Sequence, residues 1–405
     1  MALIASLFGC CPYAATTGVA LIALILFIIL GRLCRQRERD TLNQPESRNS
    51  EARTLQSQSS DFRATQPLPY PDWSIENTRP LAYRAFRYGP KYNVTMGLRA
   101  IDHQDWIQLD NQFPRYHADK ARRIVERGQE CSRTAPEAFP AAVELFEELA
   151  RYLPKRYPGL YRRTTVGLDN VWSGESFNIV ERPLKEDPIT MCARLVQDDL
   201  ALMLPGHDGQ YYLLSGAILL AGFWRLKDKF GMPLSEIHNS GNVPQFREKL
   251  ETGMGKFFAR LRPEELYSRF NYFIQVDDNL AWSESIGPEN GPEDVRGWDA
   301  AAKNKAIEHH WFRSERQTLR RLPQTGAIVF TIRTYFMPIT DLAKEERVPG
   351  RLASAIRSWG DDVGRYKGRE KYEGVLLAYL DEAHQRQIDG GLDLDKEDEV
   401  HNYPW

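Results

Sequence analysis

The sequence has few cysteines, no long run of one charge and no nucleic-acid-binding pattern. Its five cysteines are scattered and form no Cys-x-x-Cys pair: Cys10, Cys11, Cys34, Cys131 and Cys192. They therefore indicate neither a zinc site, an iron–sulfur cluster nor a disulfide framework, and this usage suits a reducing compartment. The formal net charge of -2 and the lack of a basic stripe with interleaved aromatic residues argue against nucleic-acid binding.

Common nucleotide-binding and hydrolase motifs are also missing. No Gly-x-Gly-x-x-Gly follows an expected strand, and residues 253–256 lie in an amphipathic helical pattern without P-loop spacing. The sequence contains neither His-Glu-x-x-His nor Gly-x-Ser-x-Gly. These absences disfavour the common hydrolase and kinase classes.

The first 31 residues carry no charged side chain. Within them, residues 14–31 form an apolar run close to the ~20 residues that a membrane-spanning helix needs. A cleaved signal peptide is the alternative, but no basic residue precedes the run, and four arginines follow it at positions 32, 35, 37 and 39. We expect a single-pass protein of the endoplasmic reticulum membrane, with the rest of the chain in the cytosol.

The composition divides the chain into four parts. We expect a membrane anchor at residues 1–34, a flexible polar linker at 35–80, a folded domain at 81–388 and an acidic tail at 389–405. The folded part mixes helix and strand patterns without regular βαβ alternation, which favours an α+β fold. Clear patterns are a helix from residue 139, a hairpin over 195–204 and 211–223, a helix over 246–261 and a C-terminal helix around 372–380.

Residues 309–336 organise the expected domain. They form two ordered elements separated by a turn at residues 322–326. In the second element the apolar residues at 328, 330 and 332 alternate with the set at 329, 331, 333 and 335, as in a β-strand. The first element mixes charged and aromatic residues. We therefore expect one face of this unit to be core and the other to be a polar pocket wall.

Some histidines and aspartates are candidate ligands. His238 follows the expected hairpin and precedes a glycine-containing loop and a helix. This setting fits either a surface or capping histidine, or an axial ligand of a metal or haem. Neighbouring His309 and His310 would point apart on a helix or strand, which disfavours a shared metal. The Asp-Asp pairs at 198–199 and 277–278 each fit a cation site or an ordinary solvated turn or strand end.

Charged residues in expected ordered segments are further candidates. Arg269 and Arg333 fit carboxylate binding, for example to haem propionates, or pairing with an acidic side chain. Glu315 fits a buried general base or an ion pair with Arg316. The residues alone leave both alternatives open in each case.

Several of these residues lie in segments that together resemble one family. The block Glu-Arg-Gln-Thr-Leu-Arg-Arg-Leu-Pro at residues 315–323, continued by Phe-Thr-Ile-Arg-Thr-Tyr at 330–335, is similar to the signature of the haem-dependent oxidative N-demethylases. Shorter matching pieces lie at residues 94–98, 109–110, 196–200, 224, 229–234, 237–238 and 269–271. The resemblance covers most of residues 86–345.

This resemblance implies a fold, a cofactor and a reaction. The fold would be a PAS-like antiparallel sheet surrounded by helices, and the cofactor haem b. The reaction would be a monooxygenase-type removal of an N-methyl group from a small amine with O₂. By the resemblance, His238 would be the iron ligand, Glu315 and Arg269 catalytic residues, and Arg316 and Arg333 cofactor-binding residues. Electrons would come from a separate flavin or iron–sulfur reductase, because the chain carries no motif for such a group.

Two other classes stay open at this stage. A membrane-anchored glycosyltransferase would use the aspartates at 277–278 near a metal–nucleotide site, although the arginines after the apolar run argue against its topology. A haem-free binding protein would keep the same fold without the chemistry.

Overall fold

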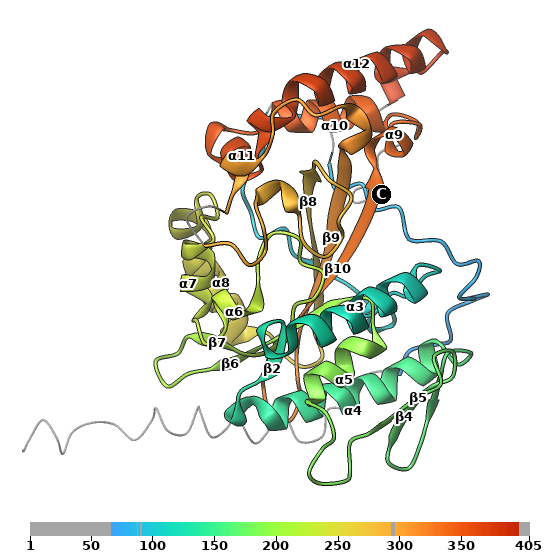
Figure 1. Cartoon of the computed structure of the whole chain (residues 1–405), viewed down its shortest axis with the longest axis vertical. Helices are drawn as coiled ribbons and strands as arrows, with labels where there is room; N and C mark the ends of the chain where they lie inside the picture. The colour runs from blue at the N-terminus through green and yellow to red at the C-terminus, as the bar shows by residue number, and fades with distance from the viewer. Residues whose placement is uncertain (1–65, 87, 90, 293–295, 397–405) are drawn as a thin grey trace, which may run out of the picture. The chain divides into compact units, whose positions relative to one another are not determined.

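The computed structural model describes residues 66–86, 88–89, 91–292 and 296–396, which all belong to one compact unit, Phe62–Trp405 (Figure 1). The expected anchor at residues 14–31, most of the linker and the end of the acidic tail lie outside the described residues. Among the residues that are described, no helix is both long and apolar enough to cross a membrane.

A seven-stranded sheet forms the centre of this unit. Its strands follow the order β1-β8-β9-β10-β6-β7-β2, and each neighbouring pair is antiparallel. They are β1 (Arg99–Ala100), β2 (Ser132–Thr134), β6 (Asp199–Pro205), β7 (Tyr211–Ala217), β8 (Leu266–Gln275), β9 (Trp311–Arg321) and β10 (Ile328–Pro338). A smaller sheet contains β3 (Tyr161–Arg163), β4 (Gly167–Asn170) and β5 (Glu175–Asn178). With the helices described next, the α+β prediction is confirmed.

Two groups of helices cover opposite faces of the large sheet. On one face, which we call the α4 face, pack α3 (Phe113–Arg127), α4 (Phe139–Arg156) and α5 (Pro188–Leu195). On the other, the α7 face, pack α6 (Leu226–Lys229), α7 (Leu234–Ser240) and α8 (Glu251–Arg260). The alternation along β6 shows the division, since Leu200 and Leu202 join the first apolar cluster whereas Ala201 and Met203 join the second.

The C-terminal helices gather at one end of β8, β9 and β10 (Figure 1). They are α9 (Ile339–Leu342), α10 (Val348–Arg357), α11 (Asp361–Tyr366) and α12 (Glu373–Asp389). Their apolar side chains form a third cluster with Tyr272, Ile274 and Phe312 from the strands. The helices expected from residue 139 and around residues 372–380 are thus confirmed.

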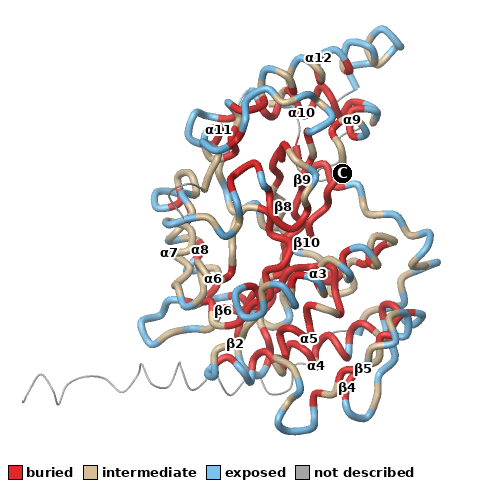
Figure 2. Tube along the Cα trace, in the orientation of Figure 1, coloured by how far each residue is buried: buried red, intermediate tan, exposed pale blue. Residues whose placement is uncertain are grey.

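The stretch at residues 309–336 is a β-hairpin. The Leu322 N–H donates to the Ala327 carbonyl at 2.8 Å, and Gly326 supplies the left-handed turn residue with φ of 71°. Because helices cover both faces, β9 and β10 are buried along almost their whole length (Figure 2). The charged residues of β9 are therefore buried too, and each needs a partner inside the protein.

Candidate functional site

Strand pairing decides which predicted site residues share a face. In the β8–β9–β10 register, Glu315 lies opposite Asn271, while Gln317 lies opposite both Arg269 and Ile332. Directly opposed residues of antiparallel strands point to the same face, and Ile332 belongs to the apolar cluster under α7 and α8. Glu315 and Arg269 therefore lie on the α7 face, together with Asn271 and Gln317.

The histidine predicted as a ligand lies on α7, which covers this same face. Its Nδ1 is 2.8 Å from the carbonyl oxygen of Leu234, one turn earlier in the helix. Because a carbonyl only accepts, Nδ1 carries the hydrogen and Nε2 of His238 keeps its lone pair. Among the described residues Nε2 has no hydrogen-bond partner. A neutral imidazole held in this tautomer is the form that binds a metal through Nε2.

An aromatic ring fixes the plane of this imidazole. The ring of Phe246 stacks on His238 with centroids 4.6 Å apart and an interplanar angle of 8°. Phe246 begins a π-helical turn, Phe246–Leu250, and it follows two residues in the left-handed region, Asn242 and Gln245, with φ of 52° and 56°. Such irregular turns are frequent at functional sites.

The surroundings of His238 also favour its neutral form. Burial lowers the imidazole pKa, the hydrogen bond to Leu234 opposes this, and the charges of Arg269 and Lys229 lower the pKa further. His238 is thus uncharged at neutral pH. The electrostatic effect of Arg269 on His238 also links α7 to the polar residues of β8 and β9.

A buried carboxylate lies on the same face. Glu315 is 7% exposed, its Oε2 accepts a hydrogen bond from Nε2 of Gln317 at 2.9 Å, and its Oε1 lies 4.0 Å from Nε of Arg313. Burial raises the pKa of Glu315, against the opposing effects of Arg313, Gln317, Lys367 and then Arg269. The Oε1 of Gln317 is itself buried and has no partner within the described residues, so the α7 face offers an unused acceptor beside the carboxylate.

Two further titratable residues, at the end of α11, interact electrostatically with this carboxylate. Lys367 is 2% exposed; its Nζ donates to Oδ1 of Asn271 at 3.1 Å and to the Tyr272 carbonyl, and it lies 4.2 Å from the ring centroid of Phe273. Burial lowers the Lys367 pKa to about 7. The Tyr366 pKa is raised to about 12, first by burial and then by Glu315. Sequence analysis missed both residues, because no motif or period connects this helix with β9.

Arg316 and Arg333 lie on the other side of the sheet. They are directly opposed in the register, one position away from Glu315, so alternation directs them to the α4 face. Arg333 is fully buried and pairs with Asp110, with Nη2 to Oδ2 at 2.6 Å, while Arg316 donates to the carbonyls of Trp106 and Asp105. Glu315 and Arg333 therefore lie on opposite faces of the sheet and do not share one pocket wall. A cofactor-binding role for the two arginines stays a prediction that this geometry does not favour.

The Asp-Asp pair at 198–199 is buried and not solvated. Asp198 and Asp199 are 0% and 2% exposed. One Asp199 oxygen accepts the Leu220 N–H at 2.8 Å, and the other lies 3.9 Å from Nζ of Lys120. A lysine in contact with this pair supplies the positive charge that a cation would otherwise bring.

The pair at 277–278 and the two neighbouring histidines form no metal site in the described structure. The Asp277 carboxylate accepts hydrogen bonds from Ser283 and Ser285 and organises its own loop. His309 is exposed whereas His310 is buried. Across the part of the chain that the structure describes, no three His, Cys, Asp or Glu side chains gather as a metal site would require. A metal–nucleotide site at Asp277 loses its support.

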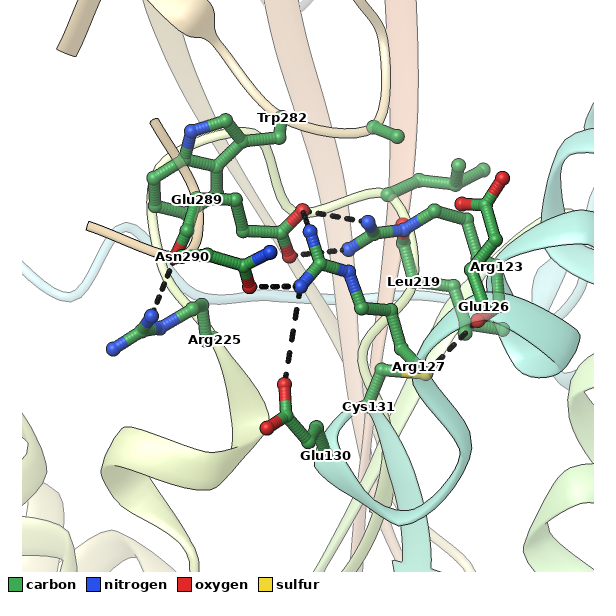
Figure 3. Close-up of polar contacts among 12 residues, drawn as sticks. Arg123, Glu126, Arg127, Glu130, Cys131, Leu219, Arg225, Trp282, Glu289 and Asn290 are labelled. Carbon is green, nitrogen blue, oxygen red and sulfur yellow. Dashed lines mark hydrogen bonds and ion pairs between the residues drawn. The ribbon is translucent and has the colours of Figure 1, made fainter. Parts of the chain in front are cut away.

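A second polar cluster lies between α3 and the loop after β8 (Figure 3). The Glu289 carboxylate pairs with Arg123 at 2.6 Å and with Arg127 at 2.8 Å, and the Glu289 carbonyl accepts from Arg225. The residues also line a small cavity. Because the carboxylate is bound from two sides, we assign this cluster to fastening the loop and not to ligand binding.

Comparison with known protein families now adds to this geometry. A family model described as "Haem-dependent oxidative N-demethylase, alpha subunit-like" matches residues 97–377. The chain belongs to this family. The resemblance seen in the sequence is confirmed, and the matched region includes His238, Arg269, Glu315 and Lys367. The family name implies dependence on haem and an oxidoreductase of the N-demethylase type.

The residues on the α7 face fit a haem. A histidine imidazole is one of the side chains that hold haem iron, and Nε2 of His238 has no hydrogen-bond partner among the described residues. The apolar cluster around α7 and α8 includes side chains that are only partly buried, among them Val94, Met96, Phe257 and Phe330. Partly buried apolar side chains suit a flat, largely apolar ligand.

Proposed function

We propose that this protein is a haem b-dependent oxidoreductase that removes an N-methyl group from a small amine with O₂. One observation carries the proposal: the neutral His238, whose Nε2 has no hydrogen-bond partner within the described part of the chain, lies on the same sheet face as the buried carboxylate of Glu315. Family membership supports the reaction type. We also propose that the antiparallel sheet is a PAS-like core, which the strand pairing and the family support.

The chain's own residues have separate tasks in this proposal. His238 would hold the iron through Nε2, the partly buried apolar residues of the α7 face would hold the porphyrin, and Arg269 would pair with a haem propionate or lie in the amine pocket. Bound haem supplies the iron centre at which O₂ is activated. Glu315 binds the amine and holds its proton, because a protonated amine resists oxidation. Burial makes Glu315 a stronger base than a solvent-exposed carboxylate.

The test of this role is amine-dependent formaldehyde release by the haem-loaded, full-length chain supplied with a reductase. Glu315→Gln keeps the size and polarity of the side chain but removes its basicity, so we expect the rate to fall by about 100-fold. Glu308→Gln alters an exposed residue just before β9 and should leave the rate unchanged. Equal rates for wild type and Glu315→Gln would refute the role of Glu315, and no formaldehyde from any simple N-methylamine would refute the proposed reaction.

We propose further that residues 14–31 anchor the chain in the endoplasmic reticulum membrane with the domain in the cytosol. The apolar run and the arginines after it support this orientation, which would give a separate membrane-bound reductase access to the domain. In sealed microsomes, added protease should digest the domain without detergent. Digestion only after detergent would reverse the proposed orientation, and recovery of the chain in the soluble fraction would contradict the anchor.

A further inference from the structure

Of the described cations that act on Glu315, which are Arg313, Lys367 and Arg269, only Lys367 can give up a proton. The anion that acts on it electrostatically is Glu315, and the Arg269 charge opposes it. Arg313, the nearest cation to the carboxylate, does not deprotonate in proteins. The other titratable neighbour, Tyr366, is already neutral, since its pKa is raised to about 12. A second cation placed at Glu315 would therefore take from Lys367 its main counter-charge.

The hydrogen bonds of Lys367 suit a side chain that can lose one proton. An ammonium group has three N–H donors, and Lys367 uses two of them, on Asn271 Oδ1 and on the Tyr272 carbonyl. Neutral Lys367 keeps two N–H groups, so both bonds survive deprotonation. Asn271 lies directly opposite Glu315 in the strand pairing. Lys367 therefore binds the cross-strand neighbour of Glu315.

The other fully buried lysine shows the contrasting arrangement. Lys120 donates to three backbone carbonyls, those of Ala193, Val196 and Asp198. All three of its N–H groups are used, so loss of a proton would leave a buried carbonyl unsatisfied. Lys120, with three hydrogen-bond acceptors, must therefore stay charged, whereas Lys367, with two, need not.

We propose that an amine cation binds at Glu315 at the expense of the Lys367 proton, so that each amine taken up releases one proton from Lys367. This inference rests on the proposed function, since it concerns the same pocket. A charged Lys367 and a free amine cation become a neutral Lys367 and a bound amine cation, and one proton goes to solvent. The Lys367 N–H is the only bond broken.

The pH dependence follows from the direction of the shift. Burial lowers the Lys367 pKa to about 7. Below that pH the lysine is charged and must lose its proton, whereas above it the lysine is already neutral. Amine affinity therefore rises with pH up to about 7 and then levels. Lys367 faces the carboxylate of Glu315 on β9. The other charged or titratable groups around this pair are Arg313 on β9, Arg269 on β8 and Tyr366 on α11.

Calorimetric titration of the haem-loaded, full-length chain with monomethylamine, dimethylamine and trimethylamine tests the proposal. Titrations in buffers of different ionisation enthalpy count the protons released per amine. At about pH 6, wild type should release close to one proton. Lys367→Met removes the charge, and it should bind amine without proton release and with affinity independent of pH in this range. Lys367→Arg keeps a permanent charge, and it should release none and bind about tenfold more weakly.

The two variants separate this role from a merely structural one. If Lys367 had only a structural role, Lys367→Met and Lys367→Arg would change the amine affinity in the same direction. The proposal instead predicts that, at about pH 6, Lys367→Met binds amine more tightly than wild type and Lys367→Arg more weakly. Lys303→Met, at an exposed position, should match wild type. Amine binding by wild type without proton release would overturn this inference alone. Absence of any amine binding would overturn the proposed function together with it.

Discussion

Individual buried side chains decide where this molecule tolerates substitution. Lys120 lies in α3 and donates to carbonyls at the end of α5 and at the residues that follow it. The Ala193 carbonyl lies in the last turn of α5, where carbonyls generally lack an intrahelical partner, and the lysine satisfies it together with the carbonyls of Val196 and Asp198. It also lies 3.9 Å from Asp199, so it compensates a buried acid as well.

Lys120→Met should lower the free energy of unfolding by about 2–4 kcal/mol, because buried carbonyls and Asp199 would lose their partner. Denaturant unfolding of the purified chain measures this difference. Lys185→Met, at an exposed position, should change stability by less than about 0.5 kcal/mol. Equal stability of the two variants would show that the three hydrogen bonds of Lys120 contribute little.

The same scale shows what sequence could and could not predict about the site. His238, Arg269 and Glu315 were predicted from motif-bearing segments, and the structure brings them to one face. Arg316 and Arg333 were predicted alongside them, but the structure places both on the opposite face of the sheet. In the segment that forms β10, the alternating pattern already placed Arg333 on the face opposite Ile328, Phe330 and Ile332. The segment that forms β9 was not assigned as a strand, so the sequence did not show that Arg316 and Glu315 point to opposite faces.

At the scale of elements, the segment between α7 and α8 sets the orientation of the predicted ligand. Its left-handed residues and π-helical turn return the chain so that Phe246 stacks on His238. No sequence period shows such a turn, since the expected helix over 246–261 reads as one regular element. The structure divides it into the turn and α8.

Phe246→Leu should weaken haem binding by about tenfold, because a ring free to rotate must be ordered when it binds iron. Phe246→Tyr keeps the stacked ring and should bind close to wild type. Haem titration gives the affinities, and the proton resonances of the His238 ring report the loss of stacking in the haem-free protein. An unchanged affinity for Phe246→Leu would mean that α7 alone orients the imidazole.

Boundaries were the least predictable feature of the elements. The first strand of the β6–β7 hairpin was expected from residue 195, but it begins at Asp199 because Leu195 ends α5. Leu195 and Val196 are as apolar as the strand residues that follow Asp199, so the pattern cannot separate a buried helix end from a buried strand. The Asp187 side chain caps α5 by accepting the Ile189 N–H, and this cap is the local signal for a helix.

At the scale of the whole molecule, the two covered faces of one sheet have different roles. The α4 face carries the largest apolar cluster and the buried Arg333–Asp110 pair, whereas the α7 face combines a smaller apolar cluster with the buried residues Glu315, Gln317 and Lys367. The α+β class followed from the mixed pattern of the sequence. The asymmetry did not, because it depends on which helices, distant in sequence, pack against each face.

The central claim is that His238 binds haem iron on the α7 face, and its most direct test is a haem titration followed by absorption. The full-length wild type and His207→Ala, which alters an exposed histidine, should bind one haem per chain and develop the same Soret band. His238→Ala should bind haem far more weakly or give a spectrum of different iron coordination. A His238→Ala variant with the affinity and spectrum of wild type would contradict the claim.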